Sequence, residues 1–160
     1  MMGVGKSTLG KIVAKKQGLT FIDTDVNIEK KCSMKISEIF NEKGEDFFRL
    51  LEEKEVLESI KKNNCVIALG GGAFIKKTII NKILKSSISI WLDINLKTLN
   101  KRVKWNKNRP LINKGNTQIK INKLYSERKN IYKLAKYKIN CNNLNKNSIV
   151  EKIISLYDKY

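Results

Sequence analysis

The chain has 160 residues, of which 41% are apolar, and a formal net charge of +18 at pH 7. This length and apolar fraction suit one domain, residues 1–160, with a sizeable core. Histidine is absent, which excludes Ser-His and Cys-His nucleophiles and histidine-ligated zinc. Any general base must therefore be a carboxylate, a lysine or a tyrosine.

The apolar runs and the cysteines indicate the cellular compartment of the protein. No apolar run approaches the roughly 20 residues of a membrane span, so we expect no membrane partner. Cys32, Cys65 and Cys141 lack metal-ligand spacing and are expected to be reduced thiols. The first residues do not have the basic and apolar regions of a secretory signal, which predicts a cytoplasmic protein.

The strong positive charge raises the question of nucleic-acid binding. Lysines are scattered over the whole chain among asparagines and isoleucines, without an arginine-rich tract or interleaved aromatic residues. We therefore expect electrostatic capture of anionic small substrates and weak nonspecific binding at low salt. No specific nucleic-acid partner is predicted.

The first predicted element is a phosphate-binding loop that opens into a helix. The run 3–8, Gly-Val-Gly-Lys-Ser-Thr, supplies most of the pattern G-x-x-x-x-G-K-[ST], and an apolar helical face follows over 7–17. Small residues let backbone N–H groups converge on a triphosphate, Lys6 neutralises the β and γ oxygens, and Ser7 would hold Mg²⁺. The first glycine of the pattern, and the strand that normally leads into it, would lie before Met1.

The rest of the chain alternates between short apolar runs and longer helical patterns. Strands are predicted at 19–22, 65–69, 87–92 and 137–140. Helices are predicted at 7–17, 26–31, 36–41, 45–62, 77–85, 96–104, 117–134 and 148–158. This alternation predicts an α/β fold in three layers, a parallel sheet with helices on both faces.

Polar residues follow the first two predicted strands, where parallel sheets bind ligands. Asp23-Thr24-Asp25 follow the first strand, and Gly70-Gly71-Gly72 follow the second. Asp25 could accept the proton of an attacking hydroxyl, although both aspartates could instead only cap the helix that begins near residue 26. The glycines would let backbone amides approach a substrate closely, or form a simple flexible turn.

Arginines stand at three further places of interest. Arg49 lies one helical turn before Glu52, which can orient its guanidinium, and Arg128 precedes Tyr132 by one turn. Bidentate guanidinium contacts would select a carboxylate, but each arginine could also be a solvated residue on a helix surface. Arg109 precedes the only proline, in a charged segment at 105–116 that we interpret as a mobile flap.

Taken together, the runs G-V-G-K-S-T, D-T-D, G-E-x-x-F-R-x-x-E, G-G-G-A, R-P-L and E-R-x-x-x-Y resemble the shikimate kinase family in order and spacing, over nearly the entire chain. The resemblance implies a P-loop NTPase fold of the nucleoside monophosphate kinase type and a monomer. The substrate-binding region would lie at about residues 26–62, and a mobile lid at about residues 105–117. The implied reaction transfers the γ-phosphate of ATP to the 3-hydroxyl of shikimate, with Mg²⁺ as cofactor, in chorismate and aromatic amino acid biosynthesis.

The resemblance also implies a role for each matching residue. ATP would be bound by the phosphate loop and two arginines, namely Gly3, Val4, Gly5, Lys6, Ser7, Thr8, Arg102 on the adenine and Arg109 in the lid. Shikimate would be bound by Asp25, Arg49, Gly70, Gly71, Gly72 and Arg128, with the two arginines on its carboxylate. The expected catalytic residues are Asp25, Lys6 and Arg109. Ser7 and Asp23 would hold the metal.

Two other interpretations stay open at the level of the sequence. One is another P-loop small-molecule kinase, acting on gluconate or on a nucleotide. The other is an inactive remnant, because the strand expected before Met1 would be the central one of this fold. Without it we expect two exposed strand edges, and either a poorly stable 160-residue chain or a translation start upstream of Met1.

Overall fold

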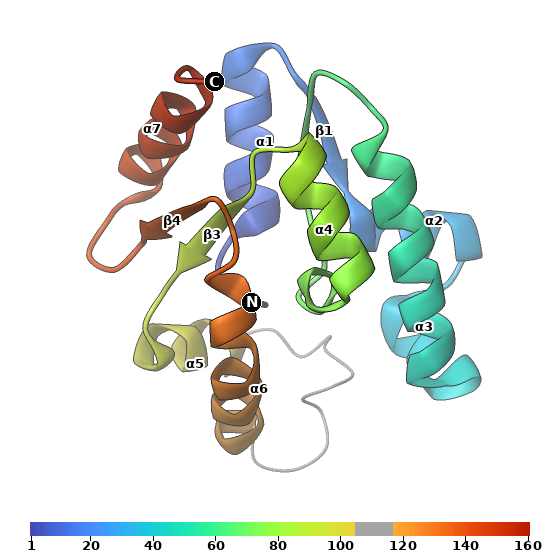
Figure 1. The fold of residues 1–160 in the computed structure, drawn as a ribbon. Coiled ribbons are helices and arrows are strands. Elements are labelled where there is room, and N and C mark those ends of the chain that lie inside the picture. Colours follow the sequence, from blue (N-terminus) through green and yellow to red (C-terminus); the bar gives the residue numbers. More distant parts are fainter. Residues whose placement is uncertain (105–116) are drawn as a thin grey trace.

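A computed structural model describes residues 1–104 and 117–160 (Figure 1). Its α-helices are α1 (Lys6–Gln17), α2 (Thr24–Cys32), α3 (Ile36–Ile60), α4 (Lys77–Ser86), α5 (Leu96–Lys104), α6 (Thr117–Tyr132) and α7 (Lys146–Tyr157). A single 3₁₀ turn, η1 (Ala73–Ile75), precedes α4. Its strands are β1 (Thr20–Asp23), β2 (Cys65–Ala68), β3 (Ile90–Asp93) and β4 (Tyr137–Asn140).

The strands form two parallel pairs. Strand β1 pairs with β2, with Thr20 opposite Cys65. Strand β3 pairs with β4, with Ile90 opposite Tyr137. Within the described ranges no pairing joins β2 to β3, so the two pairs are separate. The expected pair of strand edges without a strand partner is therefore present.

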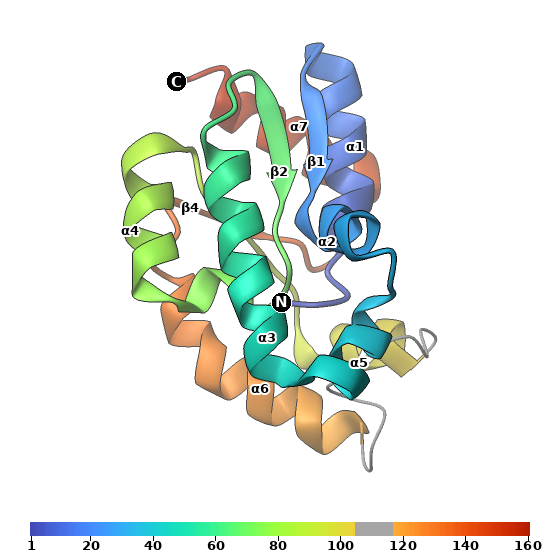
Figure 2. The ribbon, with the colours of Figure 1, turned by 90° about the vertical axis from the view of Figure 1, so that its right-hand side faces the viewer.

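Helices cover the strands on both faces, which gives the predicted three layers. Figure 2 shows α3 and α4 on one side of β1 and β2, and α1 with α7 on the other. Leu9 and Val13 of α1, Val56 of α3 and Val150 of α7 belong to one buried apolar core between these layers. In the described part of the chain, no helix has both the length and the apolar character needed to cross a membrane.

Most predicted elements are confirmed, with boundary changes that have local causes. Helix α2 begins at Thr24, two residues earlier than predicted, because the Asp23 carboxylate accepts hydrogen bonds from the next turn and caps it. The predicted break between the helices at 36–41 and 45–62 is confirmed, because α3 is interrupted at Gly44, whose φ of 84° and ψ of 171° are non-helical. Strand β3 begins at Ile90 rather than at 87, because only residues 90–93 find partners, in β4.

A second, smaller core lies beneath α2 and α3. Ile28, Ile39 and Phe48 are buried together there, and the Phe40 and Phe48 rings lie 4.8 Å apart between centroids. Lys31 of α2 also forms an ion pair with Glu55 of α3 at 2.6 Å. These contacts fix α2 against α3, and α2 begins directly where β1 ends.

Candidate active site

A polar cleft of about 760 Å³ lies where β1 and β2 end. It is lined by the phosphate loop, the start of α2, the middle of α3 and the glycine turn after β2. Most residues singled out from the sequence share this cleft: Gly3, Gly5, Lys6, Ser7, Thr8, Asp23, Asp25, Arg49, Gly71, Gly72, Arg102 and Arg128. Gly70 and Val4 do not line this cleft, and Arg109 lies outside the described residues.

The phosphate loop turns into α1 at Gly5, which has φ +97° and ends the loop. A residue with a Cβ would be strained at this angle, so the glycine is required by the backbone. The helix begins without a side-chain cap and without an acidic residue in its first turn, so its N-terminal dipole faces the cleft unopposed by a carboxylate of its own. This arrangement suits an anion.

Arg102 and Lys6 each donate a hydrogen bond to a backbone carbonyl of residues 1–4. The Arg102 Nη1 donates to the Val4 carbonyl at 3.5 Å, and the Val4 side chain is buried in the core. The Lys6 Nζ donates to the Met1 carbonyl at 2.7 Å. Both cations therefore lie next to the loop whose backbone would surround a phosphate.

Ser7 and Asp23 come together at the edge of the cleft. The Ser7 hydroxyl donates to Asp23 Oδ2 at 2.5 Å, while Asp23 Oδ1 accepts from the backbone N–H groups of Asp25 and Val26. Asp23 thus caps α2 with one oxygen and faces the phosphate loop with the other. The two roles expected for Asp23, capping α2 and holding a metal ion, are compatible, since each uses a different carboxylate oxygen.

The Ser7 and Asp23 oxygens have the chemistry that Mg²⁺ prefers. Mg²⁺ in nucleotide sites is held by one or two protein oxygens together with phosphate oxygens and water. Among the described residues there is no cluster of three or more histidine, cysteine, aspartate or glutamate side chains that could hold a metal alone. The pair fits a magnesium ion that arrives with a nucleotide.

Arg49 is fixed by two glutamates on its own helix. Its Nη1 donates to Glu52 Oε2 at 2.6 Å, the contact expected from the sequence, and its Nη2 donates to Glu45 Oε1 at 2.9 Å. Burial opposes the charge of Arg49, but these two carboxylates raise its pKa. Burial raises the pKa of the Glu52 carboxyl, and the charges of Arg49 and Arg128 oppose that rise.

The glycine turn is held in place and is not a loose connection. The Gly71 carbonyl accepts from Tyr132 Oη at 2.6 Å and from Arg128 Nη1 at 3.1 Å. Only 7% of Arg128 is exposed, so it is not a solvated surface residue. At Gly72 a Cβ would collide with the Arg49 guanidinium, so a side chain there would displace that guanidinium. The turn and both arginines are thus packed together.

Two buried residues of this site were not singled out from the sequence. Thr24 is fully buried, donates to the Ala68 carbonyl at 3.3 Å and accepts from the Gly70 N–H at 3.0 Å. Glu52 was seen only as a partner of Arg49, yet a Cβ on Gly70 would lie 2.5 Å from both Glu52 Oε1 and Asp25 Oδ1. The position of Thr24 between Asp23 and Asp25 was the sequence feature that could have identified it as a site residue.

Comparison with known proteins identifies the family of this chain. The family model described as Shikimate kinase matches residues 2–158. The chain belongs to the shikimate kinase family. A shikimate kinase of Sulfurihydrogenibium sp. (strain YO3AOP1) is 40% identical over 154 residues, which are 96% of this chain and 92% of the relative. One from Bartonella henselae (strain ATCC 49882 / DSM 28221 / CCUG 30454 / Houston 1) is 39% identical over 160 residues, 100% of this chain and 76% of the relative.

Solved structures of the family share the fold. The shikimate kinase from Acinetobacter baumannii in complex with shikimate superimposes with a TM-score of 0.94 at 31% identity, over 99% of this chain and 89% of that one. The shikimate kinase from Aquifex aeolicus vf5 gives a TM-score of 0.85 at 29% identity, over 99% and 92% of the two chains. The predicted family and P-loop kinase fold are confirmed. These matches give no support to a gluconate or nucleotide kinase.

Proposed function

We propose that this chain transfers the γ-phosphate of ATP to the 3-hydroxyl of shikimate, giving shikimate 3-phosphate and ADP. One observation carries the proposal beyond family membership. A single cleft joins a phosphate loop at the start of α1 to Asp25 and to the arginine pair Arg49 and Arg128. A phosphate donor and an acidic acceptor can therefore meet in it.

The acceptor side of the cleft suits a carboxylate that carries hydroxyl groups. Arg49 and Arg128 bind the carboxylate of shikimate through guanidinium forks, and their partners Glu52 and Gly71 hold both forks in position. Gly70, Gly71 and Gly72 leave room for the ring next to the backbone. Preset cations lower the ordering cost of binding, which favours this acceptor over a neutral sugar.

The transfer step uses Asp25 as the base. The 3-hydroxyl oxygen of shikimate attacks the γ-phosphorus, its proton passes to the Asp25 carboxylate, and the bond to the β–γ bridging oxygen breaks so that ADP leaves. Lys6 and the backbone N–H groups of 3–8 stabilise the charge on the phosphates. Ser7 and Asp23 would hold Mg²⁺, which would supply positive charge to the phosphates during transfer.

The remaining assignments complete the proposal. Arg102 packs on the adenine, and Arg109 stabilises the charge of the triphosphate. The lid expected at about residues 105–117 lies outside the described residues, apart from Thr117. Residues 26–62 form the substrate-binding region. The protein acts as a cytoplasmic monomer with ATP and shikimate as its ligands, and without a specific nucleic-acid or membrane partner.

The decisive experiment is ADP formation from Mg-ATP with shikimate, gluconate or a nucleoside monophosphate as acceptor. Turnover is expected with shikimate alone. Asp25→Asn should lower kcat by about 10²–10⁴-fold, the usual contribution of a general base. Asp46→Asn is the matched control, because Asp46 lies within residues 26–62 but does not line the cleft. This variant should keep the kcat of the unsubstituted chain. Equal turnover with gluconate would overturn the assignment of the acceptor.

A further inference from the structure

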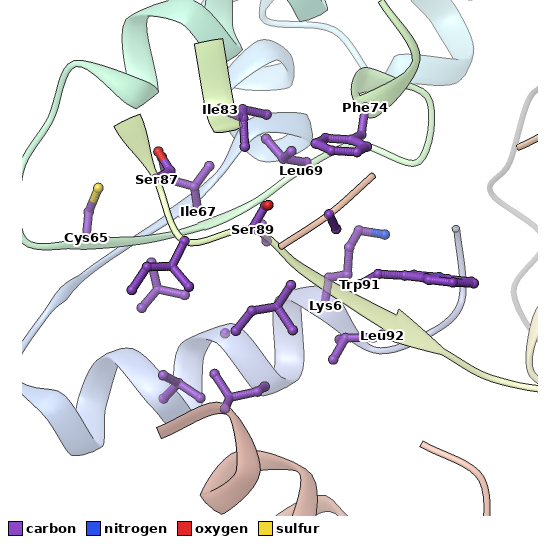
Figure 3. A pocket seen from close by; sticks show the side chains of 18 of the residues that line it. Lys6, Cys65, Ile67, Leu69, Phe74, Ile83, Ser87, Ser89, Trp91 and Leu92 are labelled. Atoms are coloured by element: carbon purple, nitrogen blue, oxygen red, sulfur yellow. The ribbon is translucent and has the colours of Figure 1, made fainter. Parts of the chain in front are cut away.

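Tyr132, the last residue of α6, belongs to the run E-R-x-x-x-Y but has no part in the proposed reaction. It is 5% exposed, and its ring centroid lies 6.2 Å from that of Trp91 on β3. Leu69, Phe74 and Trp91 line the same apolar cavity of about 410 Å³ as Tyr132 (Figure 3). A phenylalanine ring would fill this place equally well, so the hydroxyl of Tyr132 needs a separate reason.

The Tyr132 hydroxyl reaches from this cavity to the glycine turn. It donates to the Gly71 carbonyl at 2.6 Å, whereas a second acceptor, Met1 Sδ, lies 4.0 Å away and is the weaker partner. Burial raises the pKa of Tyr132, and the charge of Arg128 and a hydrogen bond with it oppose that rise. The phenol therefore stays protonated at neutral pH and can donate.

Tyr132 and Arg128 meet at one backbone oxygen. They lie one helical turn apart on α6, and Arg128 Nη1 donates to the same Gly71 carbonyl at 3.1 Å. Both residues are buried, so this carbonyl is withdrawn from water together with its two donors. A carbonyl oxygen has two lone pairs and can accept both hydrogen bonds. The paired contacts fix the Arg128 guanidinium against the turn.

The same contacts orient the peptide between Gly71 and Gly72. No described peptide bond is cis, so the Gly72 N–H points opposite to the Gly71 carbonyl and away from Tyr132. Gly72 lines the polar cleft, whereas Tyr132 does not. A Cβ on Gly72 would collide with the Arg49 guanidinium, so this peptide touches the surroundings of both acceptor arginines.

We propose that Tyr132 is a positioning residue of the acceptor site, which fixes the Arg128 guanidinium and the Gly71–Gly72 peptide where the acceptor carboxylate binds. The role rests on the proposed function, which supplies that carboxylate. Tyr132 acts through Arg128 and the turn and does not itself touch the acceptor. Because preset donors lower the ordering cost of binding, loss of the hydroxyl should weaken acceptor binding and leave the transfer step unchanged.

Tyr132→Phe removes the hydroxyl and keeps the ring beside Trp91. The KM for shikimate should rise about five- to tenfold, as expected for the loss of one buried hydrogen bond, while kcat and the KM for ATP change by less than about twofold. Tyr125→Phe is the matched control, because Tyr125 is also on α6 but donates to Asp93 Oδ1 at 3.1 Å and does not line the cleft. It should keep the KM for shikimate. An unchanged KM in Tyr132→Phe, or an equal rise in both variants, would overturn the proposal.

A neutral acceptor separates the effect on the carboxylate from a general loosening of the site. The methyl ester of shikimate keeps the ring and hydroxyl groups but presents no charge to Arg128. Its kcat/KM, taken from the initial slope, should fall by less than about twofold in Tyr132→Phe, whereas that for shikimate should fall about five- to tenfold. An equal fall for acid and ester would contradict a role through the arginine.

Arginine labelling without any acceptor keeps the role of Tyr132 apart from the proposed activity. Phenylglyoxal modification followed by peptide mass spectrometry should be about fivefold faster at Arg128 in Tyr132→Phe than in the unsubstituted chain, and unchanged in Tyr125→Phe. If the unsubstituted chain does not use shikimate, the proposed function fails, yet the labelling still decides whether Tyr132 holds Arg128. Equal Arg128 rates in all three proteins would overturn the proposal.

Discussion

Thr24 connects the two loops that carry the acceptor side of the cleft. Its hydroxyl lies between the Ala68 carbonyl and the Gly70 N–H, and its neighbours in the chain are Asp23 and Asp25. The hydroxyl is the only side-chain group that the described contacts place between these two backbone groups. Thr24 is thus a positioning residue for the glycine turn and for the proposed base.

Thr24→Val should therefore disturb both stability and acceptor binding. Valine keeps the shape but leaves the Gly70 N–H buried without this partner, which should lower the free energy of unfolding by about 1–3 kcal/mol. The KM for shikimate should rise while the KM for ATP stays constant. Thr24→Ser keeps the hydroxyl, so its free energy of unfolding and its KM for shikimate should be close to those of the unsubstituted chain. Identical behaviour of the two variants would refute the role, and urea unfolding with steady-state kinetics decides it.

Glu52→Gln addresses the orientation of Arg49. The amide keeps the volume but removes the charge that holds the guanidinium at 2.6 Å. We expect the KM for shikimate to rise about tenfold, a change of about 1.4 kcal/mol in line with the loss of a charge-assisted hydrogen bond. Glu53→Gln is the matched control, since Glu53 contacts Lys76, directly before α4, and Thr78 on α4. An unchanged KM in Glu52→Gln would show that Arg49 needs no such partner.

At the scale of elements, the glycine turn after β2 and helix α3 are packed so closely that a side chain at Gly72 would displace Arg49. Gly72→Ala should push the Arg49 guanidinium away from its position and lower kcat/KM for shikimate by about 10²-fold, the cost of an ångström-scale misplacement. If the collision is the cause, Gly72→Ala should add little to the effect of Arg49→Ala in a double-mutant cycle.

Gly18→Ala separates this local effect from a loss of stability. Gly18 ends α1 with φ +64° and has open space around it, so alanine there is strained but collides with nothing. It should lower Tm and leave the KM for shikimate unchanged. Should Gly72→Ala behave like Gly18→Ala, the contact with Arg49 would have no part in acceptor binding.

At the scale of the whole molecule, stability in acid depends on the α2–α3 ion pair. Burial opposes the charge of Glu55, but hydrogen bonds from Lys31 and Asn27 prevail and lower its pKa. A carboxyl with a lowered pKa in the folded state stabilises the protein above the unfolded value, near 4.5, and this contribution is lost as the pH falls through the folded value. The free energy of unfolding should thus fall from about pH 5 to pH 3.

Glu55→Gln should reduce that dependence on pH. At pH 7 the variant should be less stable by about 1–2 kcal/mol, a modest value because more than half of the Lys31 side chain is exposed. Between pH 5 and pH 3 its curve should be flatter than that of the unsubstituted chain. Parallel curves in urea unfolding at several pH values would place the acid sensitivity elsewhere.

The sequence predicted the elements better than their ends. The alternation of apolar runs gave the order of strands and helices, because periodicity reflects which face of an element is buried. It missed η1 and placed the start of the third strand three residues early, because a strand extends only as far as its partner does. The Asp23 cap moved the start of α2 for a reason that a side-chain pattern shows only weakly.

By itself the sequence determined the local chemistry of this protein. The phosphate loop, the helix behind it and the pairing of Arg49 with Glu52 involve residues only a few positions apart, where backbone geometry fixes the distance. The tertiary structure alone decided which distant groups meet. Ser7 reaches Asp23 across 16 residues, Gly70 reaches Thr24 across 46 and Arg128 reaches Gly71 across 57. Such contacts follow from how the layers pack, and no local pattern encodes that packing.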